Sequence, residues 1–260
     1  MKLRLGSRLL GGAAALVLAT QAQATTCRQA LALGLDVSGS VDTREYRLQT
    51  DGLANALRDP EVEAAFLAMP GLPVRLMVFE WSGLHDQRVV IPWTDVRDAG
   101  ALLRIAGALN GMDKDGAQDG ATAIAAAMLF GVQALKAQRD CLQWTLDLSG
   151  DGPANIGMHP MDITDADVAG VTINGLTVLP FSRANTTKNL TNVKTLADYY
   201  TSFVLRGPGA FVERASSFDD FSSAMRRKLL RELQLPNLSL DLTPEARDGH
   251  AHHRKGSRTQ

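Results

Sequence analysis

Residues 31–40 read Leu-Ala-Leu-Gly-Leu-Asp-Val-Ser-Gly-Ser, and this stretch decides the fold. Its apolar first half is typical of a strand buried on both faces, as in a parallel sheet. The run ends abruptly in three oxygen-bearing side chains, Asp36, Ser38 and Ser40. A buried strand followed at once by polar residues predicts a functional site at the carboxyl edge of a sheet, where open α/β sheets bind their ligands.

The rest of the chain alternates between strand and helix patterns. Further strands are expected at residues 74–81, 88–93, 142–149, 171–179 and 210–214. Helices are expected after the capping pair Asp42 and Glu45 and at residues 99–109, 122–135, 190–203 and 218–233. This alternation predicts an α/β fold with a mostly parallel sheet, in which the second and third strands pair as a hairpin.

The first 24 residues have the pattern of an export signal. Lys2, Arg4 and Arg8 precede a short apolar run at residues 9–19, and Ala22-Gln23-Ala24 resembles a signal-peptidase site. The apolar run is shorter than the roughly 20 residues that a membrane-spanning helix needs. We therefore expect cleavage after residue 24 and export, to the periplasm or the outside of the cell; an uncleaved N-terminal anchor is the alternative.

Length and composition indicate one globular domain. With 45% hydrophobic and 21% charged residues, the chain is expected to fold over residues 25–235. The polar residues 236–260 show no apolar period and are predicted to be a disordered tail. No run after the signal suits a membrane span, which predicts a soluble mature protein. A formal net charge of −1 gives no reason to expect a nucleic-acid partner.

A metal site is predicted where three polar elements meet. Besides the first strand end, Gly150-Asp151-Gly152 ends another strand and Thr122 opens a helix. Small hard cations such as Mg²⁺ prefer oxygen ligands. Hydroxyls of Ser38, Ser40 and Thr122 would contact the ion, and Asp36 and Asp151 would hold its waters. The alternative is that these residues are ordinary turn formers and helix caps.

The same motifs, at Asp36 to Ser40, Thr122 and Gly150 to Gly152, resemble the metal-ion-dependent adhesion site of von Willebrand factor A domains. The chain looks closest to an uncharacterised bacterial family of that fold, over roughly residues 29–235. The resemblance implies a Rossmann-like, mostly parallel sheet with one antiparallel edge strand and helices on both faces. It also implies a metal site at Asp36, Ser38, Ser40, Thr122 and Asp151, without an established reaction.

Two further carboxylates are candidates near the predicted ion. Glu80 ends an apolar strand, and is interpreted either as a contributor to the ion's surroundings, including a plug for an open position, or as a salt-bridged strand-end residue. Asp119 belongs to an unusually acidic loop with Asp113 and Asp115. These acids either add ligands and favour calcium or are solvated loop residues, since Asp is common in loops.

The two cysteines, Cys27 and Cys141, are predicted to form a disulfide, because an even pair in an exported protein favours one. In the fold that the sequence resembles, the strands ending at Asp36 and Asp151 are parallel neighbours. The cysteines precede these aspartates by similar distances, so they are expected side by side at the opposite edge. Neighbouring strands lie about 4.8 Å apart, within the roughly 4.4 to 6.8 Å between Cα atoms that a disulfide tolerates.

The leading functional hypothesis is a binding module whose ion, most readily Mg²⁺ with Ca²⁺ or Mn²⁺ as alternatives, accepts an Asp or Glu of a partner protein. The rival is a hydrolase that uses the same ion to activate water. A catalytic base is supplied only by Glu80 or Asp119, and no nucleophile elbow or dinucleotide fingerprint is present. His159 and the basic run at residues 226–231 are expected to be solvated surface groups.

Overall fold

The computed structural model describes residues 26–114, 120–179 and 195–234. The predictions of a signal peptide at residues 1–24 and of a tail at residues 236–260 lie outside this range, as do Asp119 and the first residues of the helix predicted at 190–203. Within the described residues, no helix combines the length and apolar character that crossing a bilayer requires.

Six strands form one sheet in the order β3-β2-β1-β4-β5-β6. Only β2 and β3 pair antiparallel, and every other neighbouring pair is parallel. The strands are β1 (Cys27–Asp36), β2 (Val74–Trp81), β3 (Gln87–Val96), β4 (Cys141–Gly150), β5 (Val171–Val178) and β6 (Val212–Ala215). The predicted mostly parallel sheet with an antiparallel edge strand is confirmed.

Six α-helices connect the strands. They are α1 (Thr43–Leu57), α2 (Pro60–Phe66), α3 (Ala99–Asn110), α4 (Ile124–Lys136), α5 (Leu196–Phe203) and α6 (Phe221–Glu232), with 3₁₀ turns at Pro160–Asp162 and Phe218–Asp220. The capping box of Asp42 and Glu45 starts α1 as predicted. Helix α2 was not among the expected helices; Asp59 caps it and Pro60 is its first residue.

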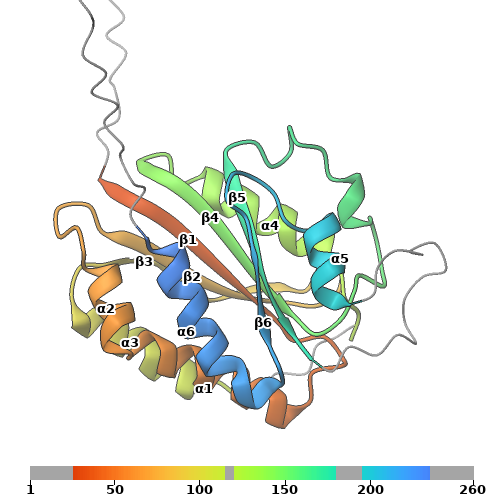
Figure 1. Cartoon of the computed structure of the whole chain (residues 1–260), viewed down its shortest axis with the longest axis horizontal. Helices are drawn as coiled ribbons and strands as arrows, with labels where there is room; N and C mark the ends of the chain where they lie inside the picture. Colours follow the sequence, from red (N-terminus) through yellow and green to blue (C-terminus); the bar gives the residue numbers. More distant parts are fainter. Residues whose placement is uncertain (1–25, 115–119, 180–194, 235–260) are drawn as a thin grey trace, which may run out of the picture.

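Apolar side chains form a separate core on each face of the sheet. On one face, the leucines of β1 pack with α1, α2, α3 and α6. On the other face, the alanines of β1 pack with α4 and α5 (Figure 1). The whole of β1 is buried, as expected for a central strand covered by helices on both sides.

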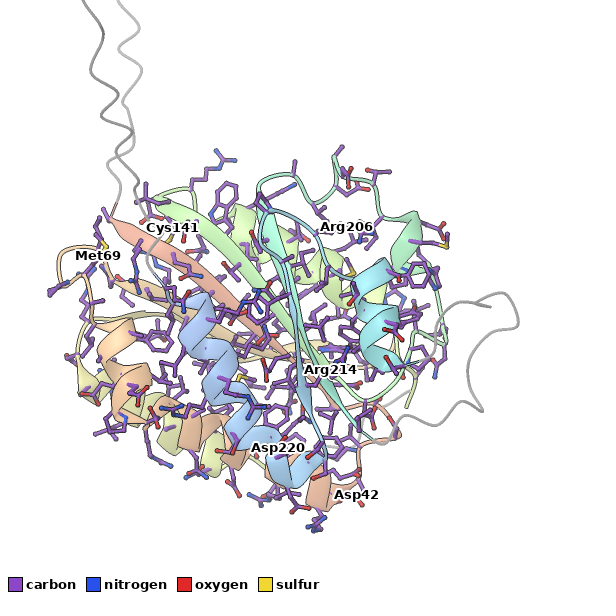
Figure 2. All side chains as sticks on the ribbon, viewed as in Figure 1. Asp42, Met69, Cys141, Arg206, Arg214 and Asp220 are labelled. Atoms are coloured by element: carbon purple, nitrogen blue, oxygen red, sulfur yellow. A yellow bond between two sulfur atoms is a disulfide. The ribbon has the colours of Figure 1, made fainter. Side chains whose placement is uncertain are left out.

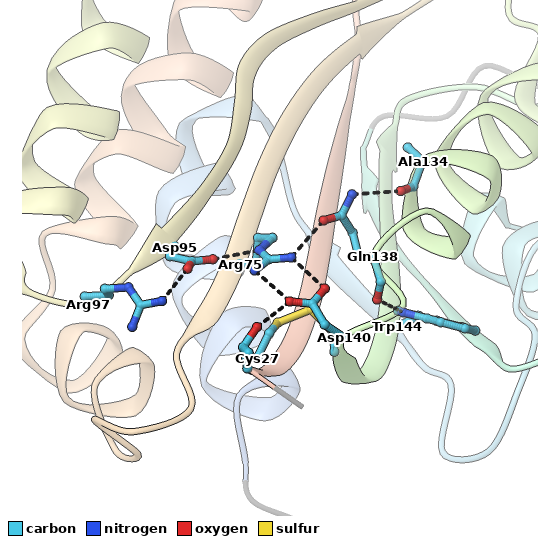
Figure 3. The surroundings of a disulfide bond; sticks show 10 residues. Cys27, Arg75, Asp95, Arg97, Ala134, Gln138, Asp140 and Trp144 are labelled. Atoms are coloured by element: carbon cyan, nitrogen blue, oxygen red, sulfur yellow. Dashed lines mark hydrogen bonds and ion pairs between the residues drawn. A yellow bond between two sulfur atoms is a disulfide. The ribbon is translucent and has the colours of Figure 1, made fainter. Parts of the chain in front are cut away.

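The parallel register of β1 and β4 sets the two ends of the molecule. Cys27 is the register partner of Cys141, and the two form a disulfide with a Cα–Cα distance of 4.3 Å (Figure 3). The predicted bond is therefore confirmed. Cys141 and Asp42, which follows the polar motif of β1, lie at opposite ends of the protein (Figure 2). The polar motif thus occupies the edge farthest from the disulfide.

Candidate metal centre

The carboxyl edge of the two central strands brings together most of the predicted ligands. Asp36 is the last residue of β1, and Asp151 directly follows β4. The backbone N–H of Ser38 donates to Oδ1 of Asp36 at 2.8 Å. The Ser40 hydroxyl donates to Oδ1 of Asp151 at 2.7 Å and lies 3.2 Å from the Ser38 hydroxyl. Two carboxylates and two hydroxyls therefore form one connected cluster.

Thr122 reaches the same edge through its loop. Gly39 N–H donates to the carbonyl of Gly120 at 2.9 Å, which ties the loop before Thr122 to the Ser38–Ser40 turn. Helix α4 begins at Ile124, so the expectation that Thr122 opens the helix is wrong by two residues. This difference leaves Thr122 in an extended lead-in, where its side chain is 5% exposed.

Asn155 holds Thr122 in place and was not singled out from the sequence. Its Oδ1 accepts from Thr122 N–H at 2.8 Å, and its Nδ2 lies 3.5 Å from the Thr122 hydroxyl oxygen. The Asn155 N–H in turn donates to the Thr122 carbonyl at 3.0 Å. Asn155 lies four residues after Asp151, so the loop that follows β4 contributes both a candidate ligand and the group that orients another.

The electrostatics of the cluster favour a bound cation. Burial, and then the nearby Asp151 carboxylate, raise the pKa of Asp36 to about 7. Burial also raises the pKa of Asp151. Oδ2 of Asp36 is buried and has no hydrogen-bond partner among the described residues. A divalent cation would offset both negative charges and give the buried carboxylate the opposite charge that it lacks.

The donor types fit a hard cation. Nowhere among the described residues do three His, Cys, Asp or Glu side chains gather as a ligand set, so a site at this edge depends on hydroxyl oxygens beside the carboxylates. Magnesium accepts such a mixture of oxygen donors and retains several of its waters. The residues therefore fit a divalent cation held by oxygen ligands.

Glu80 belongs to a different environment. It is the register partner of Leu35, so it shares the face covered by α1, whereas Asp36 points to the other face. Its Oε1 accepts from the Tyr46 hydroxyl at 2.6 Å, and its Oε2 pairs with Arg88 at 2.7 Å. Of the interpretations left open, the structure supports the salt-bridged strand-end residue rather than a plug or a group beside the ion.

The acidic loop and His159 were also singled out from the sequence. Asp113 forms an ion pair with Arg47 and is solvent-exposed; Asp115 and Asp119 lie outside the described residues. His159 is not a free surface group, because its Nε2 lies 3.1 Å from the Tyr199 hydroxyl and its ring packs on Phe203.

The basic run on α6 contains one fully buried residue, which the sequence did not reveal. The Lys228 side chain is 0% exposed and its Nζ lies 3.0 Å from Asp147 of β4 and 2.6 Å from Glu232. Asn174 of β5 also donates to Glu232 at 2.7 Å. A buried charged cluster therefore links α6 to the middle of the sheet, away from the strand ends.

Solved structures of similar fold show the class of protein. Proximal thread matrix protein 1 of the mussel byssus aligns with a TM-score of 0.54 and 15% identity over 82% of this chain and 49% of its own; another structure of it has a zinc-occupied MIDAS motif. The pilus adhesin SpaC of Lactobacillus rhamnosus GG aligns with a TM-score of 0.55 and 14% identity over 81% of this chain and 31% of its own. This chain thus spans half or less of these two proteins. Its fold is that of a von Willebrand factor A domain.

The family follows from a match over residues 26–237 to a profile described as "Protein of unknown function (DUF1194)". Because this match covers most of the sequence, the chain belongs to that family. Another protein of similar structure is an aerotolerance-related membrane protein of Bacteroides fragilis, with a TM-score of 0.50 and 16% identity over 78% of this chain and 98% of its own. A comparison with curated proteins finds no match.

Proposed function

We propose that this protein is an exported binding module that uses one divalent cation to recognise an acidic group on a partner protein. The observation that carries the proposal is the buried Asp36 beside Asp151, both with raised pKa values and with serine hydroxyls between them. No lysine or arginine of the described residues forms an ion pair with either aspartate. A cation is the partner that such a cluster lacks.

The proposed roles follow from distance and burial. Ser38, Ser40 and Thr122 offer neutral oxygens to the ion, while Asp36 and Asp151 accept hydrogen bonds from its waters. Neutral ligands leave most of the ion's charge uncompensated, so a carboxylate from outside is attracted to it. Magnesium is the expected ion on this donor set, with manganese and calcium as alternatives.

Export is supported by the disulfide between Cys27 and Cys141. Such bonds persist in oxidising compartments and are rare in the reducing cytosol. We therefore place the protein in the bacterial periplasm or outside the cell.

The rival proposal, a metal-dependent hydrolase, needs a general base beside the ion. Glu80 is committed to Tyr46 and Arg88, and Asp119 lies outside the described residues. Among the proteins of similar fold, one is named an adhesin and one a matrix protein. Recognition is therefore the function that the geometry supports best.

Metal titration of the purified domain tests the site. Calorimetry with magnesium, manganese and calcium salts is expected to show one binding event, which Asp151→Asn and Thr122→Ala each abolish or weaken. Asp165→Asn, an exposed acid outside this cluster, and Thr94→Ala, a half-buried threonine of β3, serve as matched controls. Equal binding by the site variants and the parent would show that the assignment is wrong.

The partner is tested separately. Envelope proteins retained by the immobilised domain in magnesium should be released by chelator and should not be retained by Thr122→Ala. Substituting Asp or Glu residues one at a time in a retained protein should identify the acid that reaches the ion. Retention that persists unchanged in excess chelator would rule out this mode of recognition.

A further inference from the structure

Three buried polar atoms near the candidate metal centre lack hydrogen-bond partners among the described residues. They are Oδ2 of Asp36, Nε1 of Trp81 and the hydroxyl oxygen of Tyr200. The first can only accept a hydrogen bond when it is ionised, the second can only donate, and the third can do either. A buried polar group without a partner destabilises the folded state, so three in one place call for a physical explanation.

The three groups converge above one glycine. A Cβ on Gly150 would lie 2.4 Å from the Tyr200 hydroxyl oxygen, 3.2 Å from Oδ2 of Asp36 and 3.6 Å from Cζ2 of Trp81. Cζ2 is bonded to the ring carbon that carries Nε1. Gly150 therefore leaves a space that admits the Tyr200 hydroxyl beside the inner oxygen of Asp36, and any larger residue would fill that space.

A second glycine, Gly175, leaves room for the ring of Tyr200. A Cβ on Gly175 of β5 would lie 2.5 Å from Cδ1 of Tyr200, and Tyr200 is completely buried. Helix α5 thus lays this ring across the ends of β4 and β5, with its hydroxyl toward Asp36. A phenolic hydroxyl is protonated near neutral pH and can donate a hydrogen bond.

We propose that Tyr200 is a positioning residue of the metal centre, whose hydroxyl donates a hydrogen bond to Oδ2 of Asp36 once the ion is bound and fixes that carboxylate for the ion. The Trp81 ring borders the same site at Gly150, and its N–H is the other unpartnered donor there. Oδ1 of Asp36 already accepts from Ser38, so donors on both oxygens would hold the carboxylate in one orientation. The inference rests on the proposed metal-binding function, and it assigns Gly150 the role of making room for Tyr200.

The test compares two neighbouring tyrosines of α5. Tyr200→Phe removes the hydroxyl beside Asp36, and Tyr199→Phe removes one that lies by His159. For Tyr200→Phe we expect the dissociation constant for magnesium to rise about tenfold or more, as for other groups that orient metal ligands. The metal-free Tm should be unchanged or higher, because the variant loses a buried hydroxyl without a partner. Tyr199→Phe should leave the magnesium affinity as it is.

The outcomes separate the two proposals. If the parent binds none of the metals, the proposed function fails, and Tyr200 has no centre to serve. If the parent binds magnesium and Tyr200→Phe binds it equally well, only the positioning role is overturned. A lower metal-free Tm at unchanged affinity would assign Tyr200 a structural role instead.

Trp81 provides a readout that requires no change at Tyr200. In a Trp93→Phe, Trp144→Phe background, magnesium should shift the fluorescence of Trp81, because its indole lies beside Asp36. Calcium and manganese should do so only if they bind. An unchanged emission spectrum in a protein that calorimetry shows to be saturated with magnesium would contradict the convergence of these groups on the centre.

Discussion

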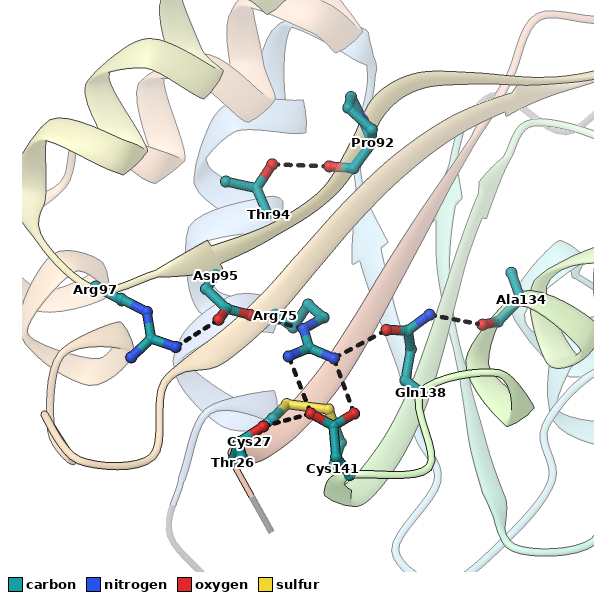
Figure 4. Close-up of polar contacts among 11 residues, drawn as sticks. Thr26, Cys27, Arg75, Pro92, Thr94, Asp95, Arg97, Ala134, Gln138 and Cys141 are labelled. Carbon is teal, nitrogen blue, oxygen red and sulfur yellow. Dashed lines mark hydrogen bonds and ion pairs between the residues drawn. A yellow bond between two sulfur atoms is a disulfide. The ribbon is translucent and has the colours of Figure 1, made fainter. Parts of the chain in front are cut away.

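The two ends of strands β1 and β4 are built in opposite ways. At the end where the strands begin, Cys27 and Cys141 are covalently joined (Figure 4), and Arg75 lies between Asp95 and Asp140 (Figure 3). At the end where they finish, Asp36 and Asp151 approach each other without an ion pair to any described residue. One end is closed and neutralised by the chain itself, whereas at the other end the only positive charge that acts on the two aspartates, among the described residues, is that of Lys114 on Asp151.

The pKa values of the aspartates also differ between the two ends. Hydrogen bonds from Arg75 and Thr26 lower the pKa of Asp140 to about 2, while burial beside Asp151 raises the pKa of Asp36 to about 7. Asp140 is therefore held ionised at the closed end, whereas Asp36 resists ionisation at the open end. The closed end is held together by the chain itself, whereas the open end is where we propose that a cation binds from solution.

In the middle of the sheet, a buried aspartate has a lysine of the same chain as its permanent counter-charge. Asp147 of β4 is as buried as Asp36, but Lys228 of α6 supplies its positive charge at 3.0 Å. The chain thus includes its own cation where compensation is needed at all times. Among the described residues, no lysine takes the corresponding position beside Asp36. This difference favours a cation that binds there reversibly from solution.

The largest effect is expected where the built-in cation is removed. Lys228→Met keeps much of the side-chain volume but leaves Asp147 and Glu232 without a positive partner. Loss of one member of a buried ion pair typically costs about 3–5 kcal/mol, and urea unfolding should show a loss of this size. Lys136→Met, at the end of α4, is the control and should change the free energy of unfolding far less. A loss below about 1 kcal/mol for Lys228→Met would mean that Asp147 needs no permanent cation.

The disulfide tests whether the two ends are independent. Replacing both Cys27 and Cys141 by alanine should lower the free energy of unfolding by about 2–5 kcal/mol. The magnesium affinity should stay within about twofold, because the length of a ten-residue strand, about 30 Å, separates the bond from Asp36. Urea unfolding and calorimetry on the same samples measure both quantities. A tenfold loss of affinity at full folding would show that closing one end shapes the other.

The last expected effect concerns pH and is the smallest per pH unit. Burial raises the pKa of Asp147 to about 7 from an ordinary value of 3.8, so the folded state binds this proton more tightly than the unfolded state. Its contribution to stability is fully present below about pH 4 and is lost as the pH rises through 7. Asp147→Asn should remove this loss, whose slope is at most about 1.4 kcal/mol per pH unit.

Urea unfolding of the parent and of Asp147→Asn at several values between pH 4 and 8 measures that slope. The difference between the two proteins isolates Asp147 from the other carboxylates, whose protons both proteins share. If this difference does not change with pH, Asp147 carries the same charge throughout the range, and its pKa is not raised to about 7 in the folded protein.

Local patterns in the sequence were sufficient for most of the fold. The strand expected at residues 74–81 has those bounds in the structure, and the capping box placed the start of α1. Helix α2 was missed because Asp59-Pro60 carries two signals at once, the end of one helix and the start of the next. An argument from residue propensities recognises only the end of the first helix here, because the apolar stripe of α2 that follows is short.

The candidate site was only partly predictable. Asp36, Ser38 and Ser40 were found because alternate residues after one strand share a motif. Tyr200 was not, because its approach to Asp36 depends on the absence of side chains at Gly150 and Gly175, which no spacing rule records.

Lys228 was expected on the surface from its basic neighbours. Its position, three residues after Met225 and four after Ala224, nevertheless places it on the buried stripe of α6. Helical phase was therefore the signal that the run of charges obscured.

The bond between Cys27 and Cys141 also determines how the domain carries tension. A partner that pulls on the edge of Asp36 and Asp151 loads β1 and β4 along their lengths, since both strands run to that edge. The disulfide joins the far ends of these strands, so force arriving along β4 passes directly into the chain at β1. Peeling the strands apart from that end would require breaking a covalent bond first. Strands β1 and β4 would therefore carry such tension together, between the edge of Asp36 and Asp151 and the disulfide at the start of β1.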